Sequence, residues 1–202
     1  MRVMDTQEIV ARLNSGSLAD QIAALDVRLS EPSSFEPNER KLIAAAALDA
    51  LRRSSDRYIL AEKLVQLGDE LNQSVIASFE QEEDSELKFY FAAILLLGGI
   101  SVGVPALLSE VRLDGVNLSL ASNLLAKAGV QELSPRLIEV LSKVPLGERT
   151  EIPTEQNDFV CTLLRCLAKI EDQFPHQLIP RFTIASTPVE IRNTVLQLWP
   201  QP

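Results

Sequence analysis

The sequence predicts an all-α protein built from stacked helical hairpins, and three observations lead to that prediction. Apolar residues recur at steps of three and four along nearly the whole chain, which is the spacing of one face of an α-helix. No stretch alternates apolar and polar residues over the length of a strand, and no Asn-Gly or Asp-Gly turn joins two such stretches. Finally, a Leu-rich segment, a turn and a proline-initiated segment recur about every 30 residues.

The first 56 residues are expected to form N-terminal capping helices. A short apolar stripe near the start is followed by a second one, which begins at Leu18 with Ser17 as its N-cap. A third helix is predicted over 38–53, because its apolar positions draw one stripe and Pro37 stands where a proline is tolerated in a first turn.

From residue 57 onward, each repeat has a first helix that ends in a Leu-rich turn and a second helix that proline opens. Glycine ends a helix well because it adopts the left-handed conformation without a Cβ penalty. A proline in the first turn loses only an N–H that has no partner there. The turn glycines are Gly68, Gly98 and Gly129. The second helices are predicted over 69–80, 103–112, 132–143 and 174–183.

Single hairpins of this kind cannot bury their apolar faces, whereas stacked hairpins can. The sequence therefore predicts an α-α superhelix, a solenoid of about four to six helical hairpins. We expect one solenoid domain over 1–202, with capping helices over 1–56 and repeats over 57–202. The fourth repeat arrives late, which indicates an insertion at about 144–156 that is either a contact loop or a harmless addition.

The repeated segments resemble the HEAT-repeat family, whose members form an armadillo-like α-α superhelix. The matching segments are Asp84–Lys88 before Ala92 and Ala93, Thr187–Arg192, Pro105–Leu108 and Pro135–Ile138. The resemblance implies a protein-binding scaffold. It also leaves open a lyase or chaperone-like protein, for example one similar to chromophore lyases, or an inhibitor or immunity-type protein that masks a basic target.

Composition excludes several classes of function. The 202 residues include 19 basic and 28 acidic ones, a net charge of -9, so a nucleic-acid partner is not expected. One histidine and two cysteines do not supply a conventional zinc site, and no cofactor or metal is predicted. The longest apolar stretch, 89–100, is shorter than the roughly 20 residues of a bilayer span, so no membrane partner is expected. The start lacks a secretory pattern, and a cytoplasmic location is predicted.

The chain offers no recognisable catalytic group, and a non-enzymatic protein is predicted. Cys161 and Cys166 lie about 140° apart around one helix, so they are expected to be small buried hydrophobes and not a ligand pair. His176 has no nucleophile beside it in any known motif. Trp199 is either a cap on the last repeat or an exposed anchor for a partner.

The charge distribution suggests a partner. Between residues 69 and 86 there are seven acidic residues and no basic one. This acidic window is either a solvated turn that caps the next helix or a patch that attracts a basic protein partner. A solenoid also presents its second helices on one surface. The candidate protein-binding residues are Glu80, Glu82, Glu83, Asp84, Glu86, Arg136, Glu139, Lys143 and His176. The protein is expected to be a monomer or a weak homo-oligomer.

Overall fold

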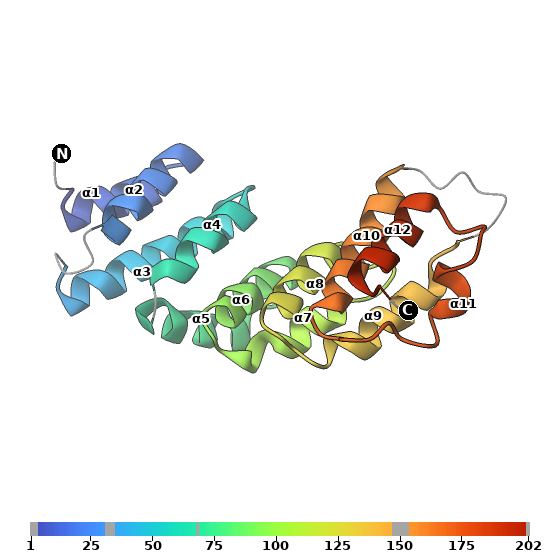
Figure 1. Ribbon diagram of the computed structural model, residues 1–202. Helices are drawn as coiled ribbons and strands as arrows, with labels where there is room; N and C mark the ends of the chain where they lie inside the picture. The colour runs from blue at the N-terminus through green and yellow to red at the C-terminus, as the bar shows by residue number, and fades with distance from the viewer. Residues whose placement is uncertain (1–3, 31–34, 68, 147–153, 201–202) are drawn as a thin grey trace. The chain divides into compact units, whose positions relative to one another are not determined.

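The computed structural model describes residues 4–30, 35–67, 69–146 and 154–200, with only the backbone described for residues 69, 70 and 154–156 (Figure 1). Within these ranges it contains twelve α-helices, two 3-10 helices and no strand. The all-α prediction is confirmed. The chain divides after Gly103 into two compact units, Met1–Gly103 and Val104–Pro202.

In the first unit, each helix packs against the helix two positions further along the chain. The pairs α1 with α3, α2 with α4, α3 with α5 and α4 with α6 are all in contact, as are the neighbours α1 with α2, α3 with α4 and α5 with α6. The elements are α1 (Thr6–Leu13), α2 (Leu18–Ser30), α3 (Pro37–Arg53), α4 (Arg57–Leu64), η2 (Val65–Leu67), α5 (Asp69–Gln81), α6 (Ser85–Leu97) and η3 (Ser101–Gly103).

The predicted starts of the early helices are confirmed. Ser17 accepts a hydrogen bond from the Asp20 N–H at 3.4 Å ahead of α2, and α3 begins at Pro37. Glu39 in the first turn of α3 also accepts from the Glu36 N–H at 2.8 Å and from the Thr6 hydroxyl at 2.7 Å. One carboxylate thereby joins the starts of α1 and α3.

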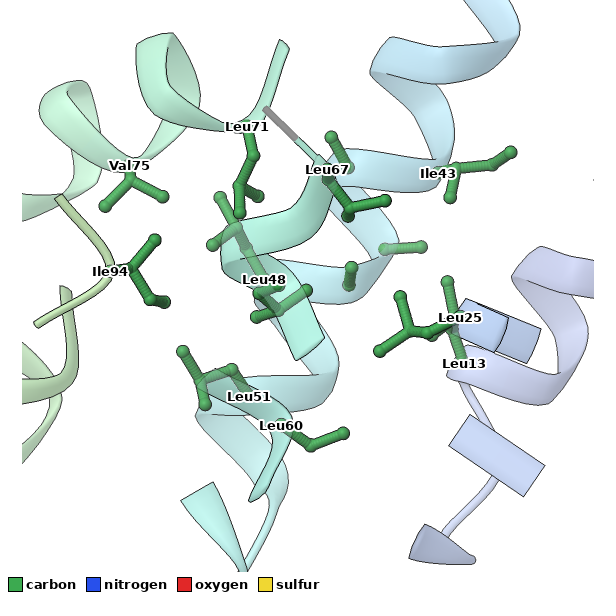
Figure 2. Close-up of a cluster of buried hydrophobic side chains, with 14 of the residues drawn as sticks. Leu13, Leu25, Ile43, Leu48, Leu51, Leu60, Leu67, Leu71, Val75 and Ile94 are labelled. Carbon is green, nitrogen blue, oxygen red and sulfur yellow. The ribbon is translucent and has the colours of Figure 1, made fainter. Parts of the chain in front are cut away.

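The core of the first unit is built from residues that the stripes place on facing helix surfaces, and all the described helices of the unit contribute to it. Figure 2 shows ten of these side chains, all buried: Leu13, Leu25, Ile43, Leu48, Leu51, Leu60, Leu67, Leu71, Val75 and Ile94. Burying such side chains removes apolar surface from water, which stabilises by about 25 cal/mol per Å².

In the second unit, α8, α10 and α12 form a row, because α10 packs against both of the others. Helices α7 and α9 both pack on α8, and α9 also contacts α10 (Figure 1). The elements are α7 (Val104–Glu110), α8 (Leu118–Lys127), α9 (Leu133–Lys143), α10 (Thr154–Ala168), α11 (Ile179–Phe182) and α12 (Val189–Leu198).

Two helices end in the same glycine motif, 30 residues apart. Gly99 has φ +80° and Gly129 has φ +69°. In both motifs the next residue donates its N–H to the carbonyl five residues earlier, at 2.8 Å from Ile100 and 3.0 Å from Val130. This is the Schellman arrangement, which satisfies carbonyls at a helix end.

The predicted turn glycine at 129 is therefore confirmed, and the prediction at Gly98 was wrong by one position. Gly98 has φ -78° and is the last residue before the left-handed Gly99. The sequence alignment pairs Leu125 with Leu97, which is only half-buried. The equivalent residue in the structure is Leu95, which is fully buried. Gly68 lies outside the described residues.

The second helix of the fourth repeat is much shorter than the predicted 174–183. Residues 176–178 form a turn, and α11 covers only Ile179–Phe182. Pro180 explains the difference, because its ring clashes with the carbonyl four residues earlier and it has no N–H to donate. Of the predicted insertion at 144–156, residues 147–153 lie outside the description and Thr154 already belongs to α10.

The aromatic residue near the end of the chain is buried, so the interpretation of Trp199 as an exposed anchor was wrong. Trp199 is 3% exposed, its ring lies 4.9 Å from that of Phe174, and its Nε1–H donates to the Glu171 carbonyl at 3.1 Å. It covers the end of α10 instead. Cys161 and Cys166 are buried, as predicted.

Candidate functional site

The structure places the acidic candidates at the turn between α5 and α6, where three of them have structural partners. Asp84 caps α6, accepting from the Glu86 N–H at 2.9 Å and the Leu87 N–H at 3.0 Å. Glu86 forms an ion pair with Arg57 at the start of α4. Glu82 lies 4.0 Å from Arg52 at the end of α3. The capping interpretation is therefore right for Asp84.

Arg52 anchors this turn to the rest of the first unit. Its guanidinium donates to Asp49 and to the Ser78 hydroxyl, both at 3.0 Å, and lies 5.6 Å from the centre of the Phe91 ring. Two carboxylates of the acidic window, Glu82 and Glu86, thus have a basic neighbour in space although the window itself contains no basic residue. Glu80 and Glu83 are exposed and have neither a capping hydrogen bond nor a basic neighbour within the described structure. The prediction of a basic partner rests on these two and stays a prediction.

Three other candidates lie together on one face of α9. Arg136, Glu139 and Lys143 are spaced by three and four residues, which places them on the same side of the helix. Glu139 accepts from Lys143 Nζ at 2.6 Å and lies 3.7 Å from Arg136 Nη1. The hydrogen bond and the charge of Lys143 hold the pKa of Glu139 below its usual value. All three side chains are more than half exposed.

This face of α9 borders two hollows that α7 and its following loop complete. The larger, of about 530 Å³, lies between α7 and α9 and is lined by Pro105, Leu108, Ser109, Glu132, Pro135, Arg136 and Glu139. The smaller, of about 180 Å³, is lined by Val111, Arg112, Leu113, Asp114, Arg136, Glu139, Val140 and Lys143. Because Arg136 and Glu139 border both, we treat the two hollows as one feature, the α7–α9 groove.

The structure adds residues to this groove that the sequence analysis did not select. Leu108 and Pro105 come from α7, and Leu113 from the loop behind it is 48% exposed. The loop turns sharply at Gly115, where a Cβ would lie 2.1 Å from the Glu110 carbonyl oxygen. The spacing of 30 residues between Pro105 and Pro135 was the sequence signal that pairs the two walls.

The remaining candidate, His176, lies apart from the groove lining. It is exposed in the turn before α11. Cys166 is buried on α10, where its Sγ lies 3.3 Å from Asn123 Oδ1, and burial raises the pKa of its thiol. A thiol with a raised pKa is a weak nucleophile near neutral pH. No group of three or more His, Cys, Asp or Glu side chains suited to a metal ion occurs among the described residues.

Comparisons of the chain with models of known protein families, with curated proteins and with solved structures find no match. In the part of the chain that the structure describes, every helix is too short or too polar to cross a bilayer.

Proposed function

We propose that this chain is a non-enzymatic interaction module of the α-solenoid type, similar to HEAT repeats, which binds a protein partner in the α7–α9 groove. The observation that carries the proposal is the groove itself. It lies between two helices that the 30-residue spacing identifies as equivalent second helices, and both pack on α8.

The packing within each unit supports a repeat architecture. Each helix from α1 to α4 contacts the helix two positions further along the chain, and so do α8 and α10 in the second unit, as stacked hairpins do. The Schellman motifs at Gly99 and Gly129 give two repeats the same helix end. Stacked hairpins leave the second helices side by side on one surface, and a partner reaches that surface without any rearrangement of the core.

The composition of the groove also supports protein binding. Apolar and charged side chains both line it: Leu108 and Leu113 are partly exposed, and Arg136 and Glu139 border both hollows. Protein interfaces combine an apolar centre with a polar rim in this way. Two hollows that share Arg136 and Glu139 suit a chain segment better than a compact small molecule.

Photo-crosslinking in cells of the source organism tests the proposal. Benzoylphenylalanine is placed at Ser109, which is exposed and lines the groove, and in a control variant at Lys127, which is exposed on α8 outside it. We expect a defined protein adduct from position 109 that position 127 does not give. No adduct at 109, or the same adducts from both positions, would overturn the proposal, provided that circular dichroism shows both variants to be folded.

A further inference from the structure

We propose that the α7–α9 groove selects a partner segment that carries acidic side chains next to apolar ones. This inference rests on the proposed function and specifies its partner class. It departs from the basic partner that the acidic window suggests, because the groove lies in the second unit and cations outnumber carboxylates around its smaller hollow.

Each hollow has an apolar surface that fits one side chain of a partner. The larger presents Pro105, Leu108 and Pro135. The two prolines lie in the first turns of α7 and α9, and their rings restrict the backbone there. The smaller presents mainly Leu113, since Val111 and Val140 in its lining are buried. Apolar side chains of a bound segment remove these surfaces from water, and the two prolines lose little conformational entropy when they are covered.

The polar rim around the smaller hollow is richer in cations. Arg112, Arg136 and Lys143 line it, against the carboxylates of Asp114 and Glu139. This excess of positive charge stands out in a chain with 28 acidic and 19 basic residues. At the far end of the larger hollow, Glu132 adds a carboxylate, so the positive end of the groove is the end near Lys143.

The ion pairs of the rim leave cations available to a partner. Glu139 is shared between Arg136 and Lys143, so one carboxylate faces two cations. Arg112 and Asp114 are 3.6 Å apart, with 59% and 83% of their side chains exposed. Exposed pairs of this kind contribute little to folding, so their exchange for a partner's carboxylate costs little. A carboxylate that contacts the Arg136 guanidinium in a fork gains two charge-assisted hydrogen bonds.

A basic segment would be repelled by the cations of this rim. Its side chains would approach Arg136 and Lys143 across an exposed surface, and like charges at an interface disfavour association. A nucleic acid would find three cations and three carboxylates around the whole groove, which is too little net charge for a phosphate backbone. The observations therefore favour an acidic, partly apolar protein segment.

Selection from a phage library of random 12-residue peptides on the intact chain tests this inference. We expect selected peptides that combine Asp or Glu with Leu, Ile, Phe or Trp, and that bind less tightly as salt is raised. Lys143→Glu is expected to weaken them about tenfold, because the attraction becomes repulsion. Lys127→Glu is the matched control, since both lysines lie in the last turn of their helices and both are exposed. The control is expected to leave affinity unchanged.

Three results would overturn the inference: selected peptides rich in Lys or Arg, peptides that bind the Lys143→Glu and Lys127→Glu variants equally well, or no enrichment over a blocked surface. A second variant, Arg136→Glu, is expected to weaken the same peptides, which separates the charge of the groove from a local effect at residue 143. Circular dichroism checks that each variant is folded. If basic peptides bind in the groove, the inference fails while the proposed function stands. If peptide selection and crosslinking at position 109 both give nothing, the proposed function fails as well.

Discussion

Replacing Ser122 with alanine is expected to stabilise the protein, which is the opposite of the usual effect of a substitution in a core. Ser122 is fully buried in α8, and its hydroxyl has no hydrogen-bond partner within the described structure. The residue 30 positions earlier is Ala92, which is also fully buried in α6. Leaving a buried hydroxyl unsatisfied costs about 1–3 kcal/mol. Alanine is also the better helix former, by up to about 0.7 kcal/mol. We therefore expect Ser122→Ala to raise the free energy of unfolding by about 1–2 kcal/mol.

A second buried serine supplies the control with the opposite sign. Ser134 is 5% exposed, and its hydroxyl donates to the Glu171 carboxylate. Removing it takes away a hydrogen bond to a charged group, so Ser134→Ala is expected to destabilise by about 1–2 kcal/mol. Urea unfolding measures both variants, with the slope unchanged and only the midpoint shifted. In a thermal melt, about 1 kcal/mol corresponds to about 2–4 °C for a chain of this length. A Ser122→Ala midpoint at or below that of the parent would refute the reasoning, because the hydroxyl must then have a partner.

Three further outcomes are expected. Leu125→Ala should lower the free energy of unfolding by about 2–5 kcal/mol because Leu125 is fully buried, and Leu146→Ala should lower it much less because Leu146 is half-buried. Equal urea midpoints for the two variants, both near the parent's, would contradict the repeat alignment. Hydrogen bonds from the Glu36 N–H and the Thr6 hydroxyl hold the pKa of Glu39 below its usual 4.5. The Glu39 carboxylate therefore stabilises the fold fully above that pH, and this stabilisation is lost as the pH falls through the lower pKa of the folded state. The stability difference between the parent and Glu39→Gln should accordingly shrink in acid, and a constant difference between pH 7 and pH 3 would argue against it. Finally, Glu80→Gln with Glu83→Gln should change the free energy of unfolding by no more than about 0.5 kcal/mol, since both side chains are exposed. The double variant should slow association with a basic partner at low salt, and an unchanged association rate would retire that partner hypothesis.

Local physical chemistry accounts for the parts of the fold that the sequence predicted. The helix after Pro37 begins where the proline fits a first turn, and the chain reverses at Gly129 because the motif needs a left-handed residue. Both depend on neighbours within a few positions. The 30-residue period is equally local in origin, because it is the length of one hairpin with its turns. The sequence predicts the elements well for this reason.

The errors arose where two local patterns competed. At Gly98 and Gly99 either glycine is able to end the helix, and only the hydrogen bonds of the formed turn select Gly99. The sequence alignment was two residues out of register there, and it chose the half-buried Leu97 in place of the fully buried Leu95. In the fourth repeat, the apolar spacing favoured a continuous helix, and the steric effect of Pro180 outweighed it.

The partners of charged side chains were the least predictable feature, because several of them lie about 30 to 40 residues away along the chain. Arg57 and Glu86 are 29 residues apart, Lys63 and Asp26 are 37 apart, and Ser134 bonds to a residue 37 positions later. A count along the chain adds up carboxylates at one turn and misses the arginines that the previous hairpin brings beside them. The same effect separates the cations of the α7–α9 groove along the chain, because Arg136 and Lys143 come from α9 and Arg112 from the loop after α7. Where helices from separate stretches of the chain pack side by side, a partner contacts the charges of a whole face and not those of one segment. This is why the groove in the second unit, and not the acidic window, carries the inference about the partner.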